Sequence, residues 1–361
     1  MCWPILIHWS IFSKKWRLWY VFLRKTVSNK IKKKKKMIIL EYESAILRNL
    51  LERSLDPHEE ISGDYSFYDL DGVRFYVEFE KDKKKKKSKK EEDQEESIIR
   101  DIIVKVYISC AKELNEQCDG EEYFDKLYKD IKTDPAKKSE TEEKKTDKIK
   151  FTHAVKFSLY DKSPEEQKKL ITLVSRIKAN IFAIPFLFVA SLVKEKSNFS
   201  PFEFPYRGST GESIYITPTD KGAAATYSIR FSDEGDKVIG KVFFQELSAA
   251  RQRVPSAPAV TYSDDPPSDL GAFKLPTRDQ KLFAYVTIGM QEAQLSDRKI
   301  QDTSYYMPLF RDYLHYHIKC AKGFMHQKMR ARTAAMLKIL DAAKPEPKHK
   351  VKRTITGKVI Q

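Results

Sequence analysis

The sequence predicts an α+β fold of two similar domains, each with an antiparallel sheet packed on helices, followed by a long C-terminal helix. Three observations carry this prediction. Apolar and polar residues alternate over several short runs, as in half-buried strands. Strand patterns come in groups rather than alternating one by one with helices, which favours antiparallel sheets. The order of helix and strand patterns in residues 163–343 occurs in a shorter form in residues 37–162.

We therefore expect five segments along the chain. The first is a basic and apolar N-terminal extension that lies outside the fold. The two α+β domains, the long helix and a basic tail follow it. The expected bounds are 1–36, 37–162, 163–307, 308–343 and 344–361, with charged loop insertions at 80–97 and 132–148.

The first domain should open with a strand and helix, or a helix alone, over residues 37–51. Asp71-Gly72 is a tight-turn signal, and the alternating run 73–79 after it predicts an antiparallel strand. Further elements are expected as a β-rich run, a short amphipathic helix and another strand, at 98–109, 121–131 and 151–160.

The second domain should begin with a helix at Ser163-Pro164. Serine is a favoured N-cap, proline suits the first helical position, and two glutamates fill the first turn. Pro185 is expected to kink or end this helix. The apolar run 181–193 is too short for a membrane span, so we expect it to be buried. Strands are predicted at 213–217, 225–231, 238–247, 259–262 and 281–290.

The net charge of +16 is concentrated at the two ends of the chain. Residues 1–36 hold eleven basic residues and no acid, and residues 344–361 hold six basic residues and one glutamate, so the rest is neutral. Within that neutral body, the segment 308–343 carries seven basic residues and two aspartates. A mildly acidic body with a basic helix is not the charge pattern of a fold that coats nucleic acid.

The predicted helix 308–343 would be about 54 Å long, longer than a small domain is wide. Part of this helix must therefore leave its own domain or be covered by something else. At about 100° per residue, one face is apolar and Arg332 projects into it, with Lys328 at its edge. Two interpretations of Arg332 remain open: its head reaches water, or a partner helix brings a carboxylate. We expect a partner-helix interface at Phe310, Leu314, Ile318, Ala321, Met325, Met329, Met336 and Leu340.

Catalytic and metal-binding patterns fail on inspection. Asp69 and Asp71 match the D-x-D-G pattern of phosphatases with an aspartyl nucleophile, but a polar segment precedes them instead of a buried strand, so a hairpin turn is expected. His315 and His317 lie about 200° apart around a helix and cannot share a metal. The four cysteines show no zinc spacing and predict free thiols. We expect no catalytic residue, no metal and no cofactor.

Several segments resemble the subunit 2 family of the actin-related protein 2/3 complex. The longest is Phe-Arg-Asp-Tyr-Leu-His-Tyr-His-Ile-Lys-Cys-Ala-Lys at 310–322, followed by Met329-Arg330-Ala331. Shorter matches lie, in the order of the family, at 37–41, 69–73, 238–246 and 354–358. The extension 1–36 has no counterpart in the family.

The resemblance implies a non-catalytic scaffold in the cytoplasm, the actin cytoskeleton and cell projections. Its long helix would pair with the long helix of subunit 4. Together these two subunits would form the core that holds the two actin-related proteins and the other subunits. They would also contact the side of the mother actin filament from which a branch is nucleated. Neither nucleic acid nor stable membrane insertion is expected. The basic residues expected at the filament are Lys319, Lys322, Lys328, Arg330, Arg332 and Lys338.

Two other functions compete with this one. A nucleic-acid-binding protein could use the charged termini. An aspartyl phosphatase would use Asp69 and Asp71, and the turn signal argues against it.

Overall fold

A computed structural model describes residues 41–56, 61, 63–81, 99–129, 131–133, 151–253, 258–275, 280–292, 294–297 and 299–344. The chain divides into two compact units, residues 1–314 and residues 315–361. The extension 1–36, nearly all of both charged insertions, and the tail after Lys344 lie outside the described residues. The nucleic-acid hypothesis, which rests on the termini, lies there too.

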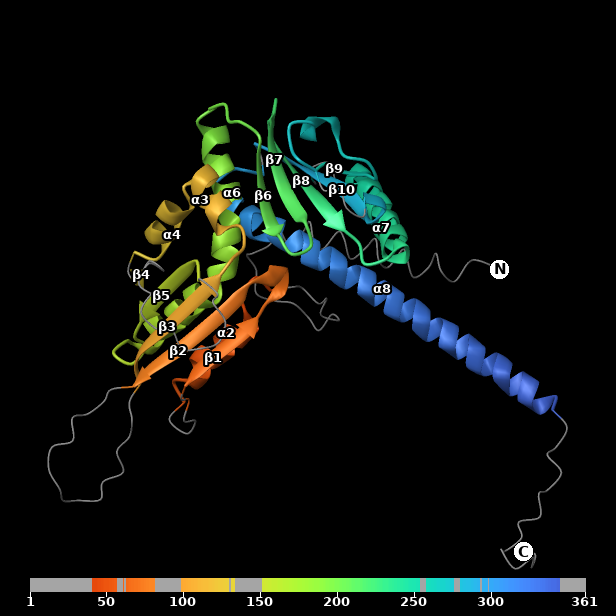
Figure 1. Ribbon diagram of the computed structural model, residues 1–361, viewed down its shortest axis with the longest axis horizontal. Helices are drawn as coiled ribbons and strands as arrows, with labels where there is room; N and C mark the ends of the chain where they lie inside the picture. Colours follow the sequence, from red (N-terminus) through yellow and green to blue (C-terminus); the bar gives the residue numbers. More distant parts are fainter. Residues whose placement is uncertain are drawn as a thin grey trace, which may run out of the picture. The chain divides into compact units, whose positions relative to one another are not determined.

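The first sheet of the larger unit is five-stranded and antiparallel, with the order β1-β2-β3-β5-β4 (Figure 1). The predicted alternation after the turn is confirmed, because Val73, Phe75, Val77 and Phe79 are buried. Its strands are β1 (Asp64–Tyr68), β2 (Arg74–Lys81), β3 (Ile99–Tyr107), β4 (Lys132–Thr133) and β5 (His153–Phe157).

The turn between β1 and β2 is built as its sequence predicts. Asp71 and Gly72 both have positive φ angles, 66° and 71°, a conformation that aspartate and glycine tolerate best. The Asp69 carboxylate accepts a hydrogen bond from the amide of Leu70 at 2.7 Å. A short 3₁₀ turn, η1 (Leu70–Gly72), results.

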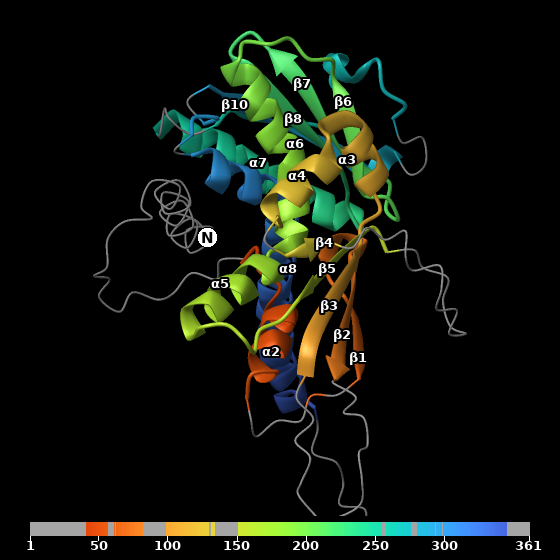
Figure 2. The same ribbon diagram turned by 90° about the vertical axis from the view of Figure 1, so that its left-hand side faces the viewer.

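Helices α2 (Ala45–Arg53) and α5 (Pro164–Ser175) pack against each other beside this sheet (Figure 2). Ser163 is the predicted N-cap of α5, and with Glu166 it forms a full capping box. Two further helices follow β3, namely α3 (Ala111–Cys118) and α4 (Gly120–Leu127). The sequence analysis predicted only the second of them.

Helix α6 (Ile177–Lys194) differs from its prediction. The predicted helix is interrupted at Arg176, so α5 ends before this residue and α6 begins after it. Helix α6 then continues through Pro185, which was expected to kink or end the helix. The apolar run of α6 is longer than the predicted 181–193, because the whole helix of 18 residues is long and apolar enough to cross a membrane by length and composition. More than half of α6 (56%) is buried inside the larger unit, and this accounts for its apolar character, as expected for a core helix.

The second sheet repeats the topology of the first, with the order β6-β7-β8-β10-β9, again antiparallel throughout. Gly222 begins β8 with a φ of 142°, and a Cβ there would lie 2.3 Å from the Met290 carbonyl oxygen. Glycine is therefore required at this close approach. The strands are β6 (Phe202–Arg207), β7 (Glu212–Thr219), β8 (Gly222–Arg230), β9 (Val260–Ser263) and β10 (Phe283–Gln291).

The strand predicted at 238–247 is wrong. The segment lies in helix α7 (Glu234–Arg253), which buries Phe243, Phe244 and Leu247. Two of the β-branched residues that favoured a strand are exposed, Val238 by 62% and Val242 by 37%. Burial at helical spacing has overridden local β propensity.

Both sheets belong to repeats with the same order of elements along the chain. Three consecutive strands are followed by one or two helices and then by two strands whose order in the sheet is the reverse of their order in the sequence. One or two further helices close each repeat. Helices α5 and α6 close the first repeat, and α8 (Ile300–Ala342) closes the second. This confirms the predicted α+β class with two similar antiparallel sheets and a long C-terminal helix. The predicted domain bounds stay a prediction. Helix α8 begins eight residues before Pro308, which was expected as its first residue.

Candidate functional site

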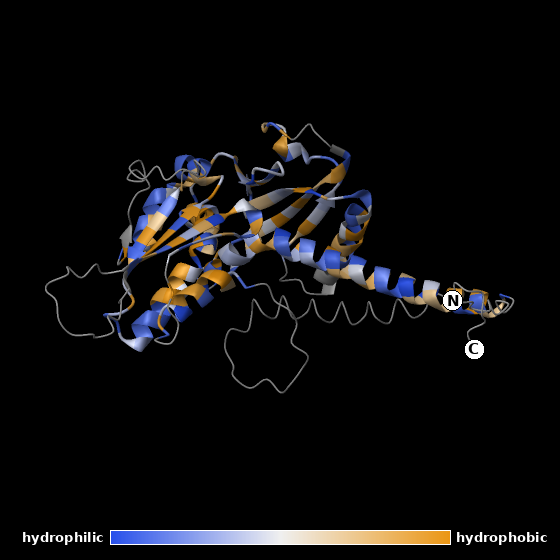
Figure 3. Ribbon diagram, turned by 60° about the horizontal axis from the view of Figure 1, so that its bottom comes forward, coloured by the Kyte–Doolittle hydropathy of each residue, from blue (hydrophilic) through white to orange (hydrophobic). Residues whose placement is uncertain are grey.

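Helix α8 carries every residue predicted to contact a partner. Its first part, up to Leu314, belongs to the larger unit, and its remainder belongs to the smaller one. Hydrophobic and hydrophilic segments alternate along the helix (Figure 3). We call Ile300–Leu314 the root of α8 and His315–Ala342 its extension.

The predicted apolar face divides into a buried part up to Ile318 and an exposed part from Met325 onward. Phe310, Leu314 and Ile318 are buried in the chain itself, with exposed fractions of 4% or less. They are therefore not available on the surface of this chain. Ala321 is half-buried. The remaining members are exposed: Met325, Met329, Met336 and Leu340, by 45% to 65%.

All six residues of the predicted basic set lie on the extension. Lys322 is half-buried, and the other five are exposed. The Lys328 ammonium lies 5.4 Å from the centre of the Phe324 ring, a cation–π distance. Arg332, which the angular map places inside the apolar face, is exposed. Both interpretations of Arg332 therefore stay open.

Aromatic packing holds the root in the larger unit. The Phe310 ring lies 5.4 Å from Tyr227 on β8 and 6.1 Å from Phe244 on α7. The Tyr227 hydroxyl donates to the Met307 carbonyl oxygen at 2.8 Å. This hydrogen bond ties the backbone of α8 to β8 immediately before Pro308, which lies inside the helix.

A buried ion network lies against the same part of α8. The Arg207 guanidinium, at the end of β6, donates to Asp71 of the β1–β2 turn and to Asp312 of α8. Its third partner is Glu212 on β7, at 3.4 Å. Asp71 also pairs with Lys178 of α6 at 3.0 Å. One arginine thus joins the first sheet's turn, the second sheet and the long helix.

Arg311 extends this network to the other side of Glu212. Its Nε donates to Glu212 at 2.7 Å, and its Nη2 donates to the Arg230 carbonyl oxygen at 3.0 Å. Glu212 is 1% exposed and also accepts from the Arg230 amide at 2.8 Å. We call the set Asp71, Lys178, Arg207, Glu212, Arg311 and Asp312 the Arg207 network.

The two aspartates of the network have opposite protonation behaviour. Burial opposes ionisation of Asp71, but the charges of Lys178 and Arg207 outweigh it and hold the pKa of this carboxyl below its ordinary value. Burial and the neighbouring charge of Asp71 raise the pKa of Asp312 to about 7, against the pull of Arg207. The Asp312 Oδ2 is buried without a hydrogen-bond partner, which agrees with a neutral carboxyl there.

The sequence analysis assigned Asp69 and Asp71 to a turn, and the structure agrees. It did not find the Arg207 network, because pairing over more than a hundred residues leaves no local pattern. One local signal was present: Arg311 and Asp312 are charged residues next to the apolar Phe310 and Leu314, and charged residues among buried ones need partners.

The described residues contain no group of three His, Cys, Asp or Glu side chains that could hold a metal ion. Cys110 and Cys118 are buried free thiols and Cys320 is an exposed one. The prediction of free thiols is confirmed for these three, and Cys2 lies outside the described residues.

Comparisons with known proteins agree with the resemblance. The family described as "Arp2/3 complex, 34 kD subunit p34-Arc" matches residues 104–347. "Actin-related protein 2/3 complex subunit 2" of Dictyostelium discoideum is 29% identical over 326 residues, covering 90% of this chain and 99% of that protein. The protein of that name from Schizosaccharomyces pombe is 25% identical over 343 residues, covering 89% and 98%.

Replacing Asp312 with asparagine should change how stability depends on pH. The folded pKa near 7 lies above the ordinary value of 3.8, so the folded chain holds the extra proton and loses stability as pH rises between these values. The stability advantage of the parent over Asp312→Asn should therefore shrink from pH 5 to pH 8, by at most about 1.4 kcal/mol per pH unit.

Denaturant unfolding of the full chain at both pH values measures this difference. Asp264→Asn is the control. Hydrogen bonding to Lys241 lowers the pKa of Asp264 to about 2, so its contribution is constant from pH 5 to pH 8. An advantage that stays constant from pH 5 to pH 8, as for Asp264, would mean that Asp312 is ionised throughout and acts as a simple partner of Arg207.

Proposed function

This chain belongs to the p34-Arc family of Arp2/3 complex subunits, and we propose that it is a non-catalytic scaffold whose α8 extension carries two interaction surfaces. A role in the complex, among its other subunits and at the actin cytoskeleton, follows from the family. The proposal adds the surfaces and their partners. It also places the protein in cell projections, where branched filaments would form.

The observation that carries the proposal is the exposure of the extension. Every residue from Gly323 to Lys344 is exposed in the chain by itself. A helix whose apolar side chains are exposed is marginal in water, because most helical stability in proteins comes from burial of an apolar face. We therefore propose that a partner covers the apolar part of this surface.

The apolar residues of the extension form a stripe. Taking Met325 as the origin, Met336, Met329 and Leu340 lie at about 20°, 40° and 60° around the helix, and Ile339 lies at about −40°. Each of these side chains is at least 45% exposed. A stripe of this width is the geometry of a helix–helix seam, so we propose that the long helix of subunit 4 packs here.

The basic residues Lys319, Arg330 and Lys338 lie at about 120° to 220° from Met325, on the opposite side. A helix packed on the stripe would leave them in solvent. We propose that these three residues contact the acidic surface of the mother filament. Lys322, Lys328 and Arg332, also expected at the filament, lie within about 60° of Met325, so a helix packed on the stripe would leave them at its edges or beneath it. In this arrangement the subunit supports nucleation by holding the complex against the side of the mother filament, and it catalyses no reaction itself.

The partner-helix surface can be tested with a matched pair of aspartates. Met336→Asp puts a charge in the stripe and should lower co-purification with subunit 4 at least tenfold, because a buried unpaired charge is costly. Ala334→Asp puts the same charge about 180° away from Met325 and should leave co-purification unchanged. Equal recovery of the two variants after co-expression and size exclusion would contradict the seam.

The filament surface can be tested by charge reversal in the assembled complex. Arg330→Glu with Lys338→Glu should weaken co-sedimentation with actin filaments several-fold and reduce its dependence on salt. Lys126→Glu with Lys168→Glu changes the net charge equally, at exposed positions of α4 and α5, and is the control. Co-sedimentation of both double variants at the parent level would remove Arg330 and Lys338 from the site.

A further inference from the structure

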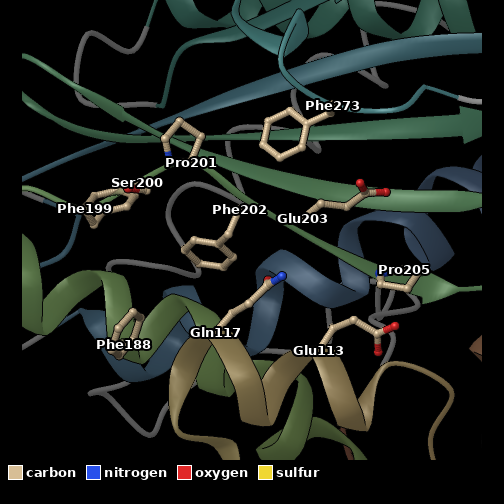
Figure 4. Close-up of a pocket in the computed structure, with 10 residues that line it drawn as sticks. All are labelled: Glu113, Gln117, Phe188, Phe199, Ser200, Pro201, Phe202, Glu203, Pro205 and Phe273. Atoms are coloured by element: carbon tan, nitrogen blue, oxygen red, sulfur yellow. The ribbon is translucent and has the colours of Figure 1, made fainter.

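A pocket of about 690 Å³ lies in the larger unit and shares no residue with the surfaces described above. Its walls come from α3, α6, β6 and the segments before β6 and after β9 (Figure 4). Its size falls within the range of about 300–1,000 Å³ that ligand pockets occupy. The lining residues are Glu113, Gln117, Phe188, Phe199, Ser200, Pro201, Phe202, Glu203, Pro205 and Phe273.

One end of the pocket is aromatic. Figure 4 shows Phe188, Phe199 and Phe202 grouped on one side. The Phe202 ring lies 6.3 Å from Phe199 and 6.5 Å from Phe188, with interplanar angles of 60° and 69°. Phe188 and Phe199 are only half-buried, so their rings remain open to a ligand.

The other end is acidic. Glu113 and Glu203 lie on the side away from the aromatic group (Figure 4). Neither forms an ion pair with any residue that the structure describes. The Glu113 Oε2 is also buried without a hydrogen-bond donor. A carboxylate oxygen in that state is costly to leave unpaired, and a cation that entered the pocket would relieve the cost.

The backbone of β6 is a poor partner for an added strand. β6 is an edge strand of the second sheet, but Pro201 and Pro205 line the pocket and have no amide hydrogens. A ligand here would therefore be recognised through its side chains rather than through strand pairing.

We propose that this pocket binds an arginine side chain carried on an extended segment of a partner protein. Arginine fits better than lysine, because its planar guanidinium stacks on aromatic rings and donates to carboxylates in more than one direction. The volume leaves room for an apolar or proline neighbour of the arginine against the phenylalanine rings. A protein partner is chosen because the chain belongs to a family of complex subunits.

The test uses the full chain and the peptide acetyl-Leu-Arg-Pro-amide, compared with the same peptide carrying citrulline, which has the shape of arginine without its charge. Saturation-transfer NMR titration should show binding of the arginine peptide in the millimolar range or tighter. The citrulline peptide should bind at least fivefold more weakly. Glu113→Gln and Glu203→Gln should each weaken the arginine peptide about tenfold, the loss expected for one charged hydrogen bond.

Glu116→Gln is the matched control, because Glu116 lies on the same helix, is exposed, and pairs with Lys112 at 3.7 Å instead of lining the pocket. Phe199→Ala should also weaken binding, and unchanged thermal melting would show that these variants fold. Equal binding of the two peptides, no effect of either glutamate substitution, or no saturation transfer from the protein to the arginine peptide would each overturn the proposal.

Discussion

The Arg207 network is the constraint on which the arrangement of the larger unit depends. Three cations and three carboxylates meet there, from a turn of the first sheet, two strands of the second, and helices α6 and α8. Removing charges from water costs nearly as much as their attraction returns, so the network adds little net stability. Breaking it is different, because loss of one partner from a buried pair costs about 3–5 kcal/mol. The network therefore acts through specificity: Arg311 and Asp312 allow one rotation of the α8 root, because any other rotation would take these partners away from the buried Glu212 and from Arg207.

The network and the aromatic packing divide α8 into two kinds of helix. The root is held by burial, by the Tyr227 hydroxyl and by Arg311, and it tolerates an internal proline. The part of the extension from Gly323 onward has no comparable burial among the described residues, since every one of them up to Lys344 is exposed. Exposed methionines are adaptable apolar side chains, well suited to a surface that another helix will cover. The same helix thus connects a self-supporting fold with a surface that needs a partner.

Local signals were enough to predict the α+β class and several elements. The Asp71-Gly72 turn, the Ser163 cap and the alternation of β10 each depend on neighbouring residues, so the sequence displays them directly. Segments governed by tertiary burial were misread. Helix α7 contains a run of β-branched and aromatic residues, and only its packing shows that Phe243, Phe244 and Leu247 share a face. Pro308 resembled a helix start, but burial of Met307 and Phe310 carries α8 across it. The division of the apolar face at Ile318 and the pairing of Arg207 with Asp71 and Asp312 depend on the folded chain, and no spacing rule reveals them.

The central claim is that the root of α8 is supported by its own chain and the extension by a partner. Amide hydrogen exchange on the full chain, alone and bound to subunit 4, measures this residue by residue. We expect amides 304–314 to be protected in both samples, and amides 323–342 to exchange quickly in the free chain and slowly in the bound one. Strong protection of 323–342 in the free chain, or no gain on binding, would contradict the claim.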